Sequence, residues 1–96
     1  MPFDMNSVIV RAADMMTAPV DQDLIILNAD NNIYIGLDDI GRAIWDMMDS
    51  PRSVDDLWRH LCREYSGDPG EIATDLLSLL HELAAEGLVR GIDIDA

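Results

Sequence analysis

The chain has 96 residues and a formal net charge of −13, because nineteen acidic residues face only six basic ones, all of them arginine. This length predicts a single domain over residues 1–96, and the acidic surface disfavours nucleic acid as a partner because it repels phosphate backbones. No run of about 18 apolar residues is present, so we expect no membrane-spanning segment and no membrane partner. The single cysteine, Cys62, has no partner for an internal disulfide, which favours a cytoplasmic location.

The first third of the chain has the composition of short strands. Residues 1–12 contain "SVIVR", which indicates either a short extra strand or a loosely ordered arm. In residues 14–22, Pro19 lacks the N–H that a central strand needs, which favours an edge strand. A nearly continuous apolar run over 23–29 predicts a strand. The turn residues "ADNN" then lead into a second strand, "NIYIGL", over 32–37.

Three helices are predicted after residue 37. Asp38 is a suitable N-cap for the first helix, which should end near Asp49 because Pro51 disfavours helical geometry at the residue before it. Ser53 is the expected N-cap of the second helix, with an acidic residue three positions later. Each of these caps is predicted from a few adjacent residues.

The third helix carries start and stop signals at both ends. Asp68 is the expected N-cap, Pro69 suits the first helical position, and Glu71 completes a capping box. Gly87 predicts the end of the helix in a left-handed conformation. The resulting order predicts an α+β, winged-helix-like fold in which an N-terminal three-stranded antiparallel sheet packs on three C-terminal helices. Such a small sheet leaves one side of the strand over 32–37 without a partner, and an open edge is either protected or used.

The apolar face of the third helix is broader than one packing contact requires. It spans about 160°, against roughly 100° for a helix that packs on a single core. One edge contains Ile72, Leu76, Leu79 and Leu83, and the other contains Ala73, Leu77, Leu80 and Ala84. Either the helix is buried on both flanks, or one edge lines a groove. Asp75 lies beside the first edge, where it is either an ordinary solvated acid or a group that orients a basic or amide-bearing ligand.

The residues of catalytic and metal sites do not occur together in this sequence. His60 and Cys62 are about 200° apart on a helix, so they do not share a metal ion. No glycine-rich phosphate loop is present, and no nucleophile has a recognisable base. We therefore predict no catalytic residue, no metal and no cofactor.

Two segments together resemble the PqqD-like proteins, also called RiPP recognition elements, over about residues 20–90. The most specific pieces are the paired strands, "LDDIGRAIW", "SVDDL" and "DLLSLLHELAAEGL". Members usually have Asn where Asp38 stands here. The resemblance implies a non-catalytic adaptor that binds the leader segment of a ribosomally made precursor peptide as an added β-strand. It also implies delivery to a leader peptidase or other modifying enzyme. The sequence looks more like the standalone elements of lasso-peptide biosynthesis than like the members that serve pyrroloquinoline quinone synthesis.

Carried onto this chain, the resemblance places peptide-binding residues on one strand and one helix edge. They are Asn32, Ile33, Tyr34, Ile35, Gly36 and Leu37 on the strand, and Asp75, Leu76, Leu79 and Leu83 on the third helix. Two alternatives of another class are a winged-helix transcription factor, which the charge disfavours, and a dimerisation module whose open edge pairs with its own copy.

Overall fold

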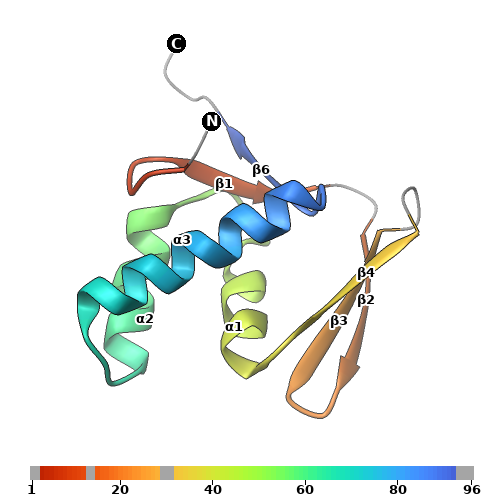
Figure 1. Cartoon of the computed structure of the whole chain (residues 1–96), viewed down its shortest axis with the longest axis horizontal. Helices are drawn as coiled ribbons and strands as arrows, with labels where there is room; N and C mark the ends of the chain where they lie inside the picture. Colours follow the sequence, from red (N-terminus) through yellow and green to blue (C-terminus); the bar gives the residue numbers. More distant parts are fainter. Residues whose placement is uncertain (1–2, 13–14, 29–31, 93–96) are drawn as a thin grey trace.

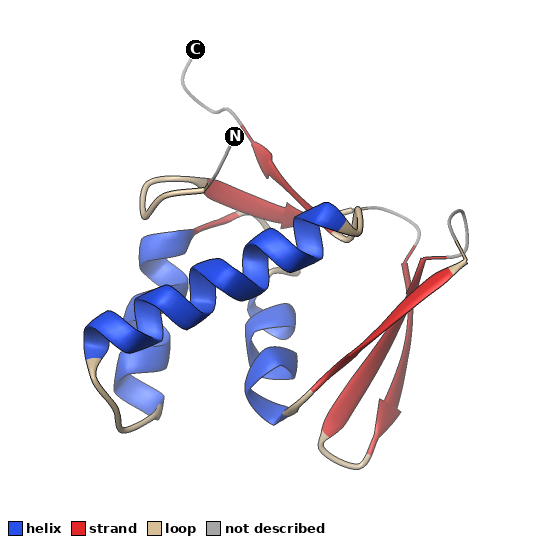
Figure 2. Ribbon diagram, viewed as in Figure 1, coloured by secondary structure: helices blue, strands red, loops and turns tan. Residues whose placement is uncertain are grey.

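The computed structural model describes residues 3–12, 15–28 and 32–92 of the chain. The chain is an α+β fold with two antiparallel sheets and a cluster of helices (Figures 1 and 2). In chain order the elements are β1 (Val8–Arg11), β2 (Met15–Val20), β3 (Asp23–Asn28), β4 (Ile33–Leu37), α1 (Asp39–Met47), β5 (Arg52–Ser53), α2 (Val54–Glu64), α3 (Pro69–Ala85) and β6 (Val89–Ile92). Figure 1 shows α3 crossing in front of α1 and α2, with β1 and β6 above them and the β2–β3–β4 sheet at the right.

The predicted N-terminal sheet is confirmed, with strand order β2-β3-β4. β2 and β3 are joined by the two residues between Val20 and Asp23, and Asp21 has a positive φ of 56° there, as tight hairpin turns require. Pro19 lies on the outer strand of the sheet, as its missing N–H predicts. Most of the "ADNN" turn, residues 29–31, lies outside the described residues, but Asn32 has the expected positive φ of 55°.

A second three-stranded sheet, of order β5-β1-β6, was not predicted from the sequence. Its central strand is β1, in which Val8 pairs with Ser53 on one side and with Ile92 on the other. Residues 8–11, for which the sequence allowed a strand or a loose arm, therefore form a strand between two partners. The segment before it is held as well, since Ser7 and Met5 accept hydrogen bonds from Val54 and Asp55 at the start of α2.

The helices begin where their caps predict. The side chains of Asp38, Ser53 and Asp68 accept hydrogen bonds from the backbone N–H three residues later, at 2.8, 3.1 and 3.0 Å, which satisfies one otherwise unpaired donor in each first turn. α1 ends at Met47, two residues before the expected Asp49, and its last turn is tightened by a hydrogen bond from Met48 N–H to the Trp45 carbonyl.

The end of α3 has the left-handed glycine that the sequence predicts. Gly87 has a φ of 77°, and Leu88 N–H donates to the Leu83 carbonyl at 2.8 Å, which is the hydrogen-bond pattern of a glycine C-cap. Leu88 is fully buried, so this turn also directs β6 back onto the core.

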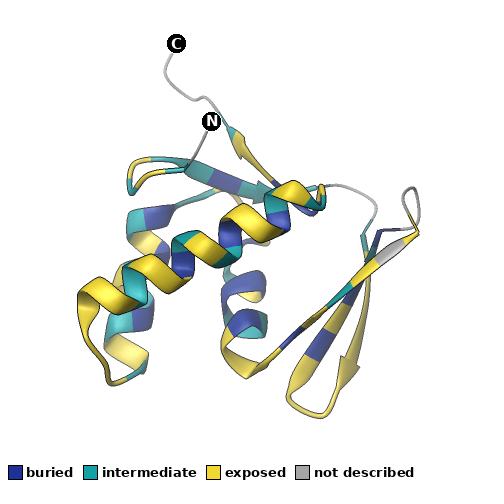
Figure 3. Cartoon of the chain, in the orientation of Figure 1, coloured by how far each residue is buried: buried dark blue, intermediate teal, exposed yellow. Residues whose placement is uncertain are grey.

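The core lies between the helices and the inner faces of both sheets (Figure 3). Its buried hydrophobic members are Ile9, Leu24, Ile26, Leu37, Ile44, Trp45, Met48, Val54, Leu57, Leu61, Leu76, Leu80, Leu83, Leu88 and Val89. On α3 only the middle of the broad apolar face is fully buried, whereas Leu77 and Leu79 on its flanks are half-buried. The breadth of that face therefore exceeds what the core covers.

Candidate functional site

A groove of about 520 Å³ lies between the first turns of α1 and the N-terminal half of α3. β4 ends at one side of it, and the connection from α2 to α3 closes the other. Apolar side chains form most of the lining, namely Leu37, Ile40, Ile44, Leu61, Tyr65, Ile72, Leu76 and Leu79. Because Ile40 is exposed and Ile72 and Leu79 are half-buried, this apolar surface is available to a ligand.

A close approach between α1 and β4 shapes this end of the groove. Gly41 is buried in the first turn of α1, and a Cβ there would lie 3.2 Å from Leu37 Cβ and 3.3 Å from Leu37 Cδ2. Such distances are tighter than ordinary van der Waals contact. A glycine is therefore the residue that lets the helix begin directly against the end of the strand.

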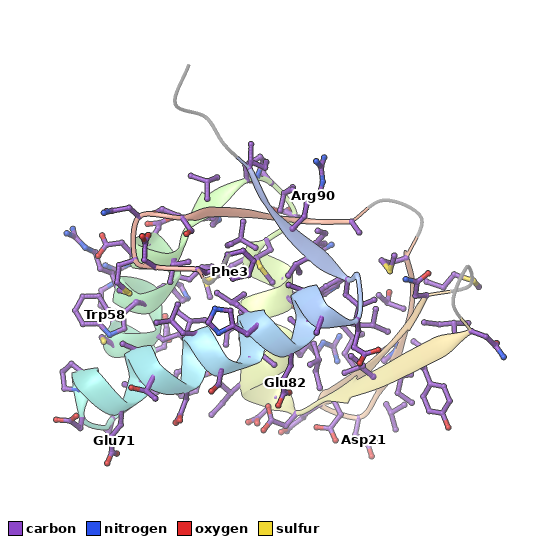
Figure 4. All side chains as sticks on the ribbon, turned by 45° about the horizontal axis from the view of Figure 1, so that its top comes forward. Phe3, Asp21, Trp58, Glu71, Glu82 and Arg90 are labelled. Carbon is purple, nitrogen blue, oxygen red and sulfur yellow. The ribbon has the colours of Figure 1, made fainter. Side chains whose placement is uncertain are left out.

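The polar lining of the groove is dominated by carboxylates. Asp38, Asp68, Glu71 and Asp75 all line it, and none of its lining residues is Arg, Lys or His. Asp38 and Asp68 are the N-caps of α1 and α3, so one oxygen of each is held by a helix N–H. Glu71 and Asp75 are exposed and lie one turn apart on α3, and Figure 4 shows Glu71 projecting from the start of that helix.

The strand that runs into the groove is the outermost strand of its sheet. β4 pairs with β3 only, so its second side has no strand partner in the described part of the chain. An unpaired strand presents a row of N–H and C=O groups to solvent. The register of the sheet determines which residues contribute those groups.

The two-residue turn fixes that register. Val20 and Asp23 close the β2–β3 hairpin, so they form a hydrogen-bonded pair, and such pairs alternate along an antiparallel ladder. Residues 23, 25 and 27 of β3 therefore bond to β2. Leu24, Ile26 and Asn28 direct their backbone groups to β4, opposite Leu37, Ile35 and Ile33 respectively. By the same alternation, the backbone nitrogen of Pro19 points away from β3, so its missing N–H removes no hydrogen bond from the sheet.

The backbone groups on the open side of β4 consequently belong to Tyr34 and Gly36. The Tyr34 side chain is 72% exposed, and a Cβ built on Gly36 meets nothing within 4 Å. A strand that approaches this edge therefore meets little steric obstruction at these two positions. The sequence alone did not reveal this alternation, because it depends on the closing pair of a turn.

The residues predicted as peptide-binding are divided by the structure. Gly36, Leu37, Asp75, Leu76 and Leu79 line the groove.

The other predicted residues lie away from the lining. Asn32 and Tyr34 are exposed, Ile35 is half-buried against the core, and Ile33 belongs to β4. Leu83 is 1% exposed and lies in the core, outside the groove lining. Peptide binding by these residues remains a prediction.

Sequence analysis missed part of the lining. Ile40, Ile44 and Tyr65 come from α1 and from the end of α2, and their apolar spacing indicated only that those helices are amphipathic. Ile72 had a usable signal, since it begins the same helical edge as Leu76 and Leu79. The neighbouring acid Glu71 was assigned only to capping.

A second exposed surface lies on the outer face of the β2–β3–β4 sheet. Met16, Ile25 and Tyr34 are exposed there, together with the half-buried Leu27. This surface is apolar and adjoins the open edge of β4, because Tyr34 belongs to both.

Within the described residues, no group of three or more His, Cys, Asp or Glu side chains is arranged to hold a metal ion, and no helix is both long and apolar enough to cross a membrane. The single cysteine, Cys62, is half-buried. His81 accepts a hydrogen bond from Phe3 N–H at 2.9 Å and stacks on the Phe3 ring.

Comparisons with known proteins agree with the resemblance noted above. Residues 23–89 match the family model described as coenzyme PQQ synthesis protein D (PqqD). The structure is similar to a solved structure described as TbiB1 in complex with the TbiA(beta) leader peptide, with a TM-score of 0.78 and 26% sequence identity over 88% of this chain and 98% of that one. No curated protein matches the sequence significantly.

Proposed function

Because this chain belongs to the PqqD family, we propose that it is a non-catalytic adaptor which binds the leader segment of a ribosomally synthesised precursor peptide. The observation that carries the proposal is the open edge of β4, which runs directly into an apolar groove. Similarity to a protein solved with a leader peptide supports the same function. The adaptor then delivers its peptide to a modifying or leader-cleaving enzyme.

Binding by strand addition follows from the chemistry of the edge. A peptide beside β4 forms main-chain hydrogen bonds with Tyr34 and Gly36, and these bonds supply affinity that does not depend on its sequence. Alternate side chains of an extended peptide point to one face, so one set enters the groove between α1 and α3. Leu79 and Ile72 provide a half-buried apolar surface that these peptide side chains contact.

A more specific proposal concerns the class of final product and the partner enzyme. We propose a role in lasso-peptide biosynthesis, with a leader peptidase as the partner enzyme. Support comes from the sequence resemblance to standalone elements of that pathway. The similarity to TbiB1, which was solved with a leader peptide, supports the leader-binding part of this role.

Two other functions compete with the adaptor role. A winged-helix transcription factor requires a cationic reading helix, whereas α3 contains no Arg or Lys. Self-pairing through the open edge of β4 is favoured by the same unpaired backbone groups as peptide addition. Light scattering at several concentrations separates the two, because an adaptor stays monomeric while a self-pairing module increases in mass.

Sequencing of the neighbouring genes identifies candidate precursor peptides, and binding and catalysis are tested together on their leader segments. We expect saturable binding in calorimetry and, after prolonged incubation, an unchanged peptide mass in mass spectrometry. Cleavage or modification by this chain alone would contradict the adaptor function. Absence of binding to the neighbouring leader, with a folded protein, would also contradict it.

A further inference from the structure

One face of α3 carries a row of acids, of which Glu71 and Asp75 line the groove. Glu71 and Asp75 are one helical turn apart, and Glu82 follows Asp75 after two turns, so the three lie on the same side of the helix. All three are exposed. Figure 4 shows Glu71 and Glu82 on the same side of α3. Leu79 lies between Asp75 and Glu82 in this row and lines the groove.

These acids have no counter-charge within the described part of the protein. The ion pairs found there join Arg52 to Asp56, Arg59 to Asp55 and His60 to Glu64, all outside the row. Like charges one turn apart repel each other and destabilise a helix slightly. A cation placed over Glu71 and Asp75 would remove that repulsion.

The apolar part of the groove lies within reach of the same acids. Leu76 and Leu79 follow Asp75 along α3 and line the groove with it, and Ile44 of α1 lines the same space. In an extended peptide, residues i and i+2 are about 6.6 Å apart on one face. A peptide therefore places an apolar side chain on Leu79 and a long basic side chain near Asp75 at the same time.

We propose that the groove selects peptides which carry an aliphatic or aromatic anchor with an Arg or Lys within two positions of it. This inference rests on the proposed function and specifies its ligand. The anchor supplies affinity by burying apolar surface, and the acids of α3 discriminate among peptides that share the anchor, as charged groups at interfaces generally do. Glu71 and Asp75 are thus specificity-determining residues.

A displayed library of random 12-residue peptides tests the selection without knowledge of the natural ligand. The full chain is used as bait, beside the Glu71→Gln/Asp75→Asn variant. A matched control, Asp46→Asn/Asp49→Asn, removes two exposed acids that do not line the groove. Circular dichroism melting confirms that each bait is folded, and Asp75→Asn alone replaces the double variant if that variant does not fold.

Wild-type and control baits should enrich peptides with an apolar anchor and a nearby Arg or Lys. The groove variant should enrich the anchor without the basic residue. For one enriched peptide, replacing its Arg by the neutral isostere citrulline should weaken binding to wild type by about 2- to 30-fold, the range for losing two exposed ion pairs. The same replacement should leave binding to the groove variant unchanged.

The outcomes separate this inference from the function on which it rests. Enrichment of apolar anchors with no basic preference would overturn the selection and leave peptide binding intact. A basic preference that persists in the groove variant would assign it to other acids and would also overturn the inference. If no peptide is enriched by any folded bait, the proposed function itself fails.

Discussion

Single proline substitutions on β4 should have opposite effects at adjacent positions. Proline removes one backbone N–H and fixes φ. The register directs the N–H of Ile35 to Ile26 of β3, whereas the N–H of Tyr34 points to the open edge. Ile35→Pro should therefore weaken the fold, and Tyr34→Pro should weaken peptide binding.

The cost to folding follows from burial and hydrogen bonding. Ile35→Pro leaves the Ile26 carbonyl without its donor, which costs about 1–3 kcal/mol. Loss of a half-buried isoleucine side chain adds about 1–2 kcal/mol, roughly half the effect of truncating a fully buried one. Tyr34→Pro breaks no ladder bond and removes a side chain that is 72% exposed, so its free energy of unfolding should change by less than about 1 kcal/mol.

Peptide affinity should fall in the Tyr34→Pro variant. In a complex with Tyr34→Pro, one carbonyl of the added peptide strand lacks a donor, which costs about 1–3 kcal/mol. This corresponds to a Kd about 5- to 160-fold higher. Urea unfolding measures the stability of each variant, and fluorescence anisotropy with a labelled leader peptide measures its affinity.

Tyr34→Ala is the matched control, because it removes the same side chain and retains the N–H. The reasoning is refuted if folded Tyr34→Pro binds the leader as tightly as Tyr34→Ala does. It is also refuted if Ile35→Pro is as stable as wild type, since the ladder would then have the opposite alternation.

Four further substitutions test contacts in the structure. Leu83→Ala should lower the free energy of unfolding by about 2–5 kcal/mol because Leu83 is fully buried, whereas Leu79→Ala should cost less stability and reduce leader affinity, as urea unfolding and anisotropy will show. Arg11→Met should destabilise by about 1.5–3 kcal/mol in thermal unfolding, because the Arg11 guanidinium donates to the Trp45 carbonyl and lies 4.8 Å from the centre of the Trp45 ring. Ser53→Ala should cost about 0.5–2 kcal/mol by removing the N-cap of α2, and an unchanged melting temperature would contradict that role.

Features set by local chemistry were predictable from the sequence. The caps at Asp38, Ser53 and Asp68 and the left-handed Gly87 depend on a few adjacent residues, so the three helices were predicted with their starts. The β2–β3–β4 sheet was predictable for the same reason, because its strands are consecutive in the chain.

Features set by distant pairing were not predictable. β5 has only two residues and β6 only four, and each becomes a strand because β1 lies beside it. No local pattern of residues indicates such a partner.

The candidate site was predictable only in part. The broad apolar face of α3 indicated a groove, and Leu79 indeed lines it. Leu83 belongs to the same helical edge but is buried. The C-terminal half of α3 packs against the core there, whereas its N-terminal half borders the groove. Helical periodicity places Leu79 and Leu83 on one face of α3. It does not determine at which residue the core stops burying that face.

Amide hydrogen exchange on β4 tests strand addition most directly. In the free protein, the N–H groups of Ile35 and Leu37 should exchange slowly because they bond to β3, while those of Tyr34 and Gly36 should exchange rapidly. Saturation with the leader peptide should slow exchange at Tyr34 and Gly36 and leave the other two nearly unchanged. Rapid exchange at Tyr34 and Gly36 in the fully bound protein would contradict the account, since the peptide would then bind without pairing to this strand.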